Sequence, residues 1–166
     1  MKRSLKRKKN QTERVIFTLE DQTVHGRFKR IAGFFPEKEA LRFRDTSMTY
    51  AELDLVSDKL AGFIADQDPN PNSQIGIYLQ PGPNQIIAIL GILKAGKCYV
   101  PLDIYFPSER NQYMFDDGEC QMLITDQQNL SQARMLAGSK TVLNIDDDFE
   151  EKPLSGEMGS DQDYCQ

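Results

Sequence analysis

The chain has 166 residues, enough for one domain with a buried core, and its net charge of −5 argues against a nucleic-acid partner, which would need clustered positive charge. No run approaches the roughly 18 consecutive apolar residues of a membrane span, so no membrane association is expected. The three cysteines, Cys98, Cys120 and Cys165, lie far apart without a C-x-x-C pair, which favours the reducing cytoplasm over a disulfide framework or a zinc site.

Both ends of the chain carry strong and opposite charge. Six of the first nine residues are Lys or Arg, whereas residues 146–166 hold eight acids against Lys152 alone. Polar residues 10–14 stand where a signal peptide would have its apolar segment, so export is not expected. We therefore predict a basic tail over residues 1–23, a folded region over 24–145 and an acidic tail over 146–166.

The folded region opens with a predicted helix, hairpin and second helix. Apolar residues over 28–35 recur at helical spacing until Pro36, which disfavours helix in the residue before it. Residues 40–44 alternate like a half-buried strand, and a turn at 45–47 and a short return strand at 48–50 should follow. Thr49 and Glu52 fit a capping box at the start of the second helix. The buried face of that helix should then consist of Leu53, Val56, Leu60 and Phe63 or Ile64.

Strands and helices alternate through the rest of the folded region. A loop is expected at 68–73, which contains two prolines. Residues 86–93 are apolar on every side, so the helix that carries them should be sandwiched within the domain, with Gly96 as its C-terminal cap. The remaining predictions are strands at 74–79, 98–100, 121–125 and 141–145, and helices at 107–117 and 129–136. This alternation indicates an α/β fold with a mainly parallel sheet.

One local match is misleading. Gly91, Gly96 and Lys97 have the G-x-x-x-x-G-K spacing of a phosphate-binding P-loop. A P-loop lies between a preceding strand and a following helix, so that its amides and the helix N-terminus face the phosphates. Here a helix is predicted before the motif and a strand after it, and Cys98 stands in place of the magnesium-binding Ser or Thr. We therefore predict that Lys97 does not bind phosphate.

A longer motif covers the same residues. Residues 93–103, LKAGKCYVPLD, closely resemble the L-K-A-G-x-x-Y-V-P-[IL]-D signature of amino-acid adenylation domains in nonribosomal peptide synthetases. Residues 106–110 with Tyr113 and Met114 are similar to the family's Y-P-x-E-R-x-x-Y-M, and residues 48–53 are similar to its T-Y-x-E-L. These motifs follow one another in the family's order.

The resemblance runs from Val24 to about Leu130, with departures at Lys97 and Cys98, which replace small residues, and at Ile104, which replaces a common proline. It implies a partial copy of the large N-terminal lobe of an adenylate-forming enzyme. Family members use ATP and magnesium to form an aminoacyl adenylate, then pass the acyl group to the phosphopantetheine thiol of a carrier domain. The parent would thus be an ATP-dependent amino-acid-adenylating ligase of the AMP-dependent synthetase/ligase (ANL) superfamily.

The resemblance also implies what this chain lacks. The family's phosphate-gripping loop, substrate pocket, ribose-binding aspartate and catalytic lysine lie downstream of these motifs, and Asp163, Tyr164 and Cys165 resemble the beginning of the strand that leads into the phosphate loop. We therefore expect no catalytic, cofactor-binding or metal-binding residue in this chain, and no turnover by it alone. Its expected partners are the missing remainder of the adenylation domain and, in the parent, the carrier domain.

Most residues of the motifs should hold the first subdomain together rather than touch a ligand; they are Tyr50, Glu52, Lys94, Gly96, Tyr99, Pro101 and Asp103. His25, the only histidine, is too isolated for a metal site and should lie near a helix start. Residues 155–160 are expected to be linker. Two alternatives stay open: a fragment of an acyl- or aryl-coenzyme A ligase, and a stand-alone non-catalytic interaction module.

Overall fold

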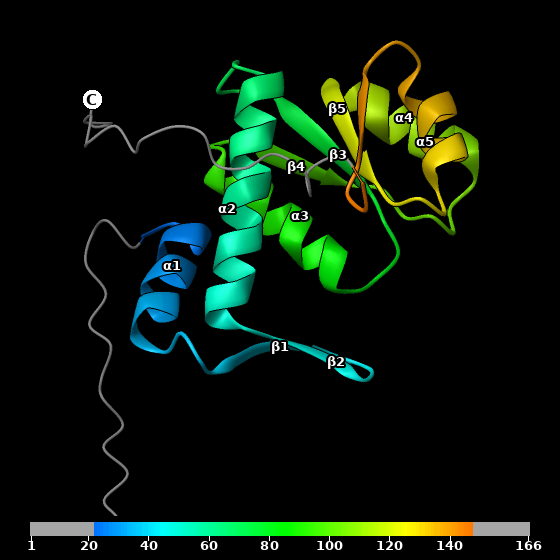
Figure 1. The fold of residues 1–166 in the computed structure, drawn as a ribbon. Helices are drawn as coiled ribbons and strands as arrows, with labels where there is room; N and C mark the ends of the chain where they lie inside the picture. Colours follow the sequence, from blue (N-terminus) through cyan, green and yellow to red (C-terminus); the bar gives the residue numbers. More distant parts are fainter. Residues whose placement is uncertain (1–21, 148–166) are drawn as a thin grey trace, which may run out of the picture.

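A four-stranded sheet with helices on both faces organises the structure, a computed structural model that describes residues 22–147 (Figure 1). The elements are α1 (Val24–Phe34), β1 (Glu39–Phe43), β2 (Thr46–Thr49), α2 (Tyr50–Gln67), β3 (Gln74–Tyr78), α3 (Pro83–Lys94), β4 (Cys98–Pro101), α4 (Ser108–Asp117), β5 (Cys120–Thr125), α5 (Leu130–Ala137) and β6 (Thr141–Asn144). Their order and type confirm the predicted elements.

Several predictions fall outside the described residues. They concern the basic tail up to residue 21, the acidic tail from residue 148, the linker at 155–160 and the strand expected to begin at Asp163. Within residues 22–147, no helix has both the length and the apolar character needed to cross a lipid bilayer.

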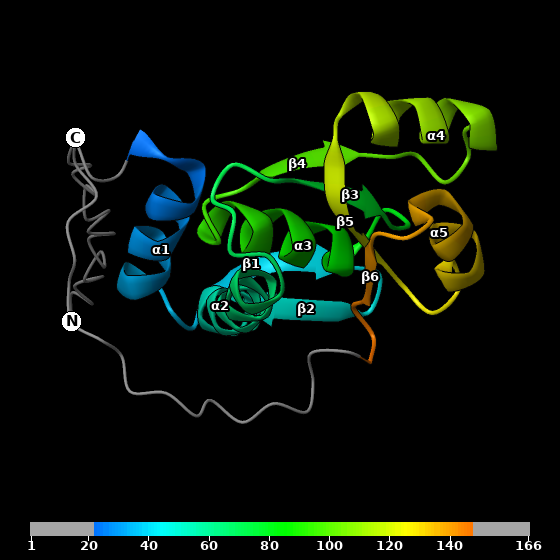
Figure 2. The same ribbon diagram turned by 90° about the horizontal axis from the view of Figure 1, so that it is seen from above.

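The sheet is parallel and its strands lie in the order β4-β3-β5-β6. Helix α3 links β3 to β4, α4 crosses back to β5, and α5 links β5 to β6. Figure 2 shows α2 and α3 on one side of the sheet and α4 and α5 on the other. Because helices cover both faces, the central strands β3 and β5 are largely buried. This arrangement confirms the predicted α/β fold.

Alternate side chains of the central strands supply two separate cores, as the two-residue period of a strand requires. Ile75 and Ile77 of β3 pack in the cluster that includes α2 and α3. Tyr78 of β3 and Leu123 of β5 belong to the cluster beneath α4 and α5.

Helix α3 lies between α2 and the sheet, as its apolar composition predicted. Ile87, Ala88, Leu90 and Ile92 are all buried. Gly91 permits the close approach of α2, because a Cβ atom there would lie 2.8 Å from Cγ of Leu60. The sandwiched position of this helix is therefore confirmed.

The hairpin of β1 and β2 is confirmed, but the position predicted for its turn was wrong. The turn was expected at 45–47, whereas strand β2 already begins at Thr46. Arg44 adopts a left-handed φ of 54°, which reverses the chain within the two residues Arg44 and Asp45. The Thr46 hydroxyl donates to the carbonyl of Phe43 at 2.8 Å and secures the start of the return strand.

Candidate functional site

The signature residues 93–103 join α3 to the loop before α4 by way of strand β4, and they begin with a Schellman motif. Gly96 has a φ of 72°, the left-handed conformation that glycine adopts without a steric penalty. The N–H of Gly96 donates to the Leu93 carbonyl and the N–H of Lys97 donates to the Ile92 carbonyl, both at 3.1 Å. The Ala-Gly pair of the signature therefore ends a helix and turns the chain into the sheet.

Lys97 points into the protein. Its side chain is 2% exposed, and its Nζ lies 3.3 Å from the Asp68 carboxylate. The same ammonium donates to the Asn70 carbonyl at 2.6 Å. Helix α3 precedes Lys97 and strand β4 follows it, which confirms the order predicted from the sequence. A P-loop has the opposite order, with the strand first and the helix second. The lysine ties the end of α3 to the loop before β3.

Lys94 is also buried, with 7% of its side chain exposed. Its Nζ lies 2.6 Å from a carboxylate oxygen of Asp54 and 2.7 Å from one of Asp58, both on α2. The ammonium lies 5.5 Å from the centre of the Phe28 ring on α1. Lys94 therefore holds three helices together through charge and a cation–π contact.

The T-Y-x-E-L motif forms the predicted start of α2. The Thr49 hydroxyl accepts from the N–H of Glu52, and the Glu52 carboxylate accepts from the N–H of Thr49, which confirms the capping box. The hydrogen bond from the backbone N–H of Thr49 holds the pKa of Glu52 below its ordinary value, and the bond from the Thr49 hydroxyl adds a smaller effect. The Tyr50 ring lies 5.8 Å from that of Phe28, so this motif also anchors α1.

The end of the signature organises the turn into α4. The Asp103 carboxylate accepts from the N–H of Tyr105 at 2.9 Å, and the Asp103 carbonyl accepts from the side-chain amide of Asn111 at 2.8 Å. The guanidinium of Arg110 stacks 4.0 Å from the centre of the Phe106 ring. The P-x-E-R motif thus fixes the first turn of its helix.

Tyr99 and Pro101 do not follow this pattern. Both are exposed on β4, which is an edge strand in the described part of the chain, and 38% of Tyr99 is accessible. Packing within residues 22–147 does not account for these two members of the signature.

The carboxyl edge of a parallel sheet is the usual ligand site of an α/β fold, at the point where neighbouring loops leave for opposite faces. That point lies between β3, which leads to α3, and β5, which leads to α5. A cavity of about 320 Å³ lies there. Asn84 donates to the Asp146 carboxylate at 3.0 Å, and Gln80 donates to Gln128 at 3.1 Å. These four side chains of the cavity lining are therefore bonded to one another in pairs.

This crevice does not fit the phosphates of ATP. Two carboxylates, Asp126 and Asp146, line it against one guanidinium, that of Arg44, which lies 5.2 Å from the Phe43 ring. Carboxylates repel phosphate, and the buried lysines Lys94 and Lys97 are already paired with acids. The crevice therefore offers the charge of Arg44 alone to an anionic ligand.

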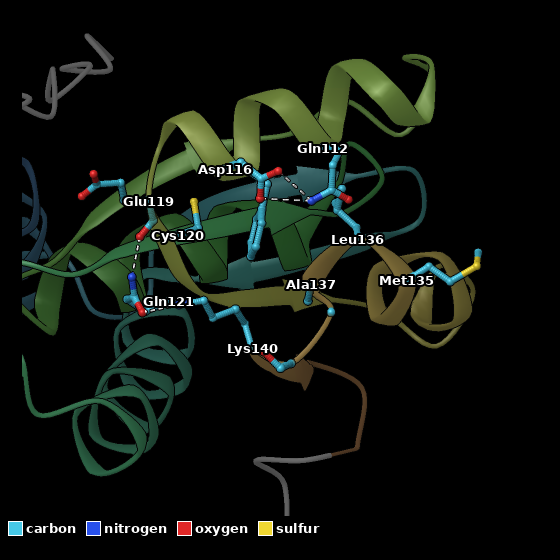
Figure 3. Close-up of a pocket in the computed structure, with 12 residues that line it drawn as sticks. Gln112, Asp116, Glu119, Cys120, Gln121, Met135, Leu136, Ala137 and Lys140 are labelled. Atoms are coloured by element: carbon cyan, nitrogen blue, oxygen red, sulfur yellow. Dashed lines mark hydrogen bonds between the residues drawn. The ribbon is translucent and has the colours of Figure 1, made fainter.

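A second cavity, of about 520 Å³, lies between α4, α5 and the starts of β5 and β6 (Figure 3). Cys120 lines it, and burial, with a smaller effect of the Asp116 carboxylate, raises the pKa of its thiol to about 11. The thiol is therefore protonated at neutral pH and is a poor nucleophile. The Asp116 carboxylate accepts from Gln112 at 3.1 Å, so the polar groups nearby are also in use.

The described residues include no group of three or more His, Cys, Asp or Glu that could hold a metal ion. His25 is the second residue of α1, which confirms its predicted place near a helix start. Burial, and then the charge of Lys94, lowers the pKa of His25, so the imidazole is neutral at neutral pH.

Comparison with known proteins shows the family of this chain. The profile described as AMP-binding enzyme matches residues 28–164. The chain belongs to the AMP-binding enzyme family. A plipastatin synthase of Bacillus subtilis (strain 168) is 43% identical over 103 residues, which are 62% of this chain and 4% of that protein. A linear gramicidin synthase of Brevibacillus parabrevis is 37% identical over 125 residues, 75% of this chain and 2% of that protein.

The fold of this AMP-binding family member also matches a solved structure. FmoA3, a nonribosomal peptide synthetase whose crystal structure holds α-methyl-L-serine-AMP, gives a TM-score of 0.73 at 26% identity, over 78% of this chain and 14% of that one. The chain thus spans a small share of its relatives, and that share is an N-terminal part of the adenylation domain.

The acidic partners of Lys94 and Lys97 were missed by the sequence reasoning. Asp54 and Asp58 lie four residues apart, so they share one face of α2, and this spacing is the signal that marks them as a pair for a cation. Asp68 lies in a polar loop and shows no such pattern, so only the fold brings it to Lys97.

Proposed function

We propose that this chain is an N-terminal scaffold portion of an amino-acid-activating adenylation enzyme of nonribosomal peptide synthesis, and that it has no activity alone. The observation that carries the proposal is the folded signature, in which Lys94, Gly96 and Asp103 are used to join α1, α2, α3 and α4. The buried charge among them, the Lys94 ammonium, is paired with the carboxylates of Asp54 and Asp58. We propose residues 24–145 as the subdomain, without a catalytic, cofactor-binding or metal-binding residue.

In the parent enzyme, ATP and magnesium would bind to residues other than those described, since the carboxyl-edge crevice does not fit phosphate. The proposed partners are the remainder of the adenylation domain and a carrier domain bearing phosphopantetheine. We also propose a cytoplasmic location, which the wide spacing of the cysteines supports.

A peptide synthetase is favoured over a coenzyme A ligase by the relatives and the motif together. The plipastatin synthase shares 43% identity with this chain over 103 residues. The residues 93–103 resemble the form of the signature that peptide synthetase modules carry.

Amino-acid-dependent exchange of pyrophosphate into ATP tests this proposal. The chain alone is expected to give no exchange with a mixture of the proteinogenic amino acids. A chimera that joins it to the segment of the plipastatin synthase downstream of the matched residues is expected to exchange, whereas that segment alone is not. Exchange by the chain alone would contradict the scaffold role, and a folded but inactive chimera would contradict the adenylation role.

A further inference from the structure

A cavity of about 340 Å³ opens beside the end of β6, between the hairpin of β1 and β2 and the helices α2 and α3. Figure 1 shows this hairpin below α2 and α3. We call the cavity the hairpin pocket. Six of its ten lining residues are apolar, namely Leu41, Met48, Val56, Pro83, Ile87 and Ile145.

The apolar lining continues the core that α2 and α3 share with the sheet. Ile87 and Ile145 are buried members of that core, 5% and 4% exposed. Leu41, Met48 and Val56 pack against it but are only half-buried. Leu41 and Met48 are partners across the hairpin, so their side chains lie on the same face of it. Apolar surface that adjoins a close-packed core favours cover by a further apolar group.

The polar groups at the rim of the hairpin pocket are already in use. Asn84 donates to the Asp146 carboxylate at 3.0 Å, and the N–H of Gln127 donates to the same carboxylate at 3.0 Å. The Thr46 hydroxyl donates to the Phe43 carbonyl at 2.8 Å. The lining includes no basic side chain. An apolar occupant therefore suits the pocket better than a charged one, which would lose its hydration without a partner.

The turn that ends β6 brings the following chain to the pocket. The N–H of Asp147 donates to the Asn144 carbonyl at 3.3 Å, and the Asn144 side-chain amide donates to the Asp147 carboxylate at 2.8 Å. Ile145 and Asp146, which lie within this turn, line the pocket. Phe149 is the first apolar residue after the turn, and the two residues from Asp147 to Phe149 span at most about 7 Å. The pocket is therefore within reach of the Phe149 ring.

We propose that the hairpin pocket is the docking site of Phe149 of the same chain. Burial of this aromatic ring joins the end of β6 to the hairpin and to α2, so the acidic segment leaves the subdomain from a fixed point. The proposal does not depend on the adenylation function, because the pocket and its occupant belong to one chain. A downstream part of the lobe, or a small molecule, is the competing occupant and would leave Phe149 exposed in the chain alone.

Fluorescence of the full chain tests the occupant. The chain contains no tryptophan, so Phe149→Trp introduces a single reporter, and Tyr164→Trp is the control at another aromatic position outside the described residues. Phe149→Trp is expected to emit at a shorter wavelength than Tyr164→Trp and to be less accessible to acrylamide, and this difference is expected to vanish in urea. Equal emission and equal quenching of the two folded variants would overturn the proposal.

Two further substitutions locate the docking site. In the Phe149→Trp background, Val56→Glu places a carboxylate in the lining and is expected to abolish the blue shift. Leu55→Glu is the matched control on α2, because Leu55 is 54% exposed and lies outside the lining, and it is expected to preserve the shift. A Val56→Glu variant that folds and keeps the blue shift would overturn the proposal.

Thermal unfolding keeps the test decisive should Val56→Glu not fold. Phe149→Ser, in an otherwise unchanged full chain, is expected to lower the unfolding midpoint by about 5–10 °C, because a buried aromatic ring is lost. Tyr164→Ser is expected to leave the midpoint unchanged. Equal midpoints for Phe149→Ser and Tyr164→Ser would show that Phe149 does not occupy the pocket.

Discussion

Lys94 and Lys97 are three residues apart, yet each is paired with acids from a different part of the fold. Burial of an ammonium group is costly unless a carboxylate compensates it. Lys94 meets Asp54 and Asp58 of α2, and Lys97 meets Asp68 of the loop before β3. These pairs fix the position of the end of α3 against both neighbours, so Lys94, a residue of the signature, and Lys97, which departs from it, both have structural roles.

Replacement of Lys97 by methionine is expected to destabilise the chain by about 1–3 kcal/mol at neutral pH, because the Asp68 carboxylate and the Asn70 carbonyl lose their buried donor. Urea unfolding followed by circular dichroism measures this loss. Calorimetric titration with ATP is expected to give no binding in either protein. ATP binding that disappears in Lys97→Met would mean that the lysine does hold phosphate.

The same variant has a defined dependence on pH. Burial acts to raise the pKa of Asp68, but Ser73, the Asn70 N–H and Lys97 together outweigh it and lower the pKa below the ordinary value of 3.8. A carboxylate with a lowered folded-state pKa stabilises the fold above its ordinary pKa, and this contribution is lost as the pH falls through the lowered value. The stability gap between wild type and Lys97→Met should therefore be full at pH 7 and shrink below about pH 4. A gap that stays constant with pH would exclude the Asp68 pair as its source.

At the scale of the elements, the contact between α2 and α3 depends on the absence of a side chain. A Cβ at Gly91 would lie 2.8 Å from Cγ of Leu60, whereas a Cβ at Gly62, in the interior of α2, would meet nothing within 4 Å. A side chain at position 91 would therefore be crowded, whereas one at position 62 would have free space.

Gly91→Ala is expected to lose a net ~1–2 kcal/mol, because the clash with Leu60 outweighs the gain in helix propensity. Gly62→Ala, the matched control, is expected to gain about 0.5–1 kcal/mol, since alanine restricts the unfolded chain at no steric cost. Urea unfolding of both variants checks the signs. Equal stabilisation by the two substitutions would show that α3 does not approach α2 as closely as the structure has it.

The elements were predictable because their signals are local. The capping box of Thr49 and Glu52, the glycine cap at Gly96 and the apolar run of α3 are each contained within a few residues. The hairpin turn was misplaced because the left-handed φ of Arg44 has no signature in an arginine side chain. Of the candidate sites, the sequence predicted only that Lys97 lies outside a P-loop. The cavity beside Cys120 and the partner of Lys97 depend on segments apart in the chain, and no local pattern records such proximity.

At the scale of the whole molecule, large apolar side chains remain exposed around α4 and α5. Tyr105 is 76% exposed, Met135 72% and Tyr113 67%. Strands β4 and β6 are the edges of the sheet in the described part of the chain. Apolar patches and open edges favour association with other protein surfaces. The relatives extend far beyond the matched residues, so the rest of a large lobe is the cover we expect for these surfaces.

Residues 24–166, fused to the downstream segment of the plipastatin synthase, are expected to unfold at a higher temperature than alone. Cover of only ~200 Å² of apolar surface would add ~5 kcal/mol at ~25 cal/mol per Å², which is large against the ~5–15 kcal/mol of a typical domain. Thermal unfolding and binding of a hydrophobic dye report the change, and fusion to an unrelated folded domain is the control. If the chain alone is monomeric, unfolds cooperatively and binds no dye, while the chimera gains nothing over the control fusion, then it is an independent module and its exposed tyrosines serve another partner.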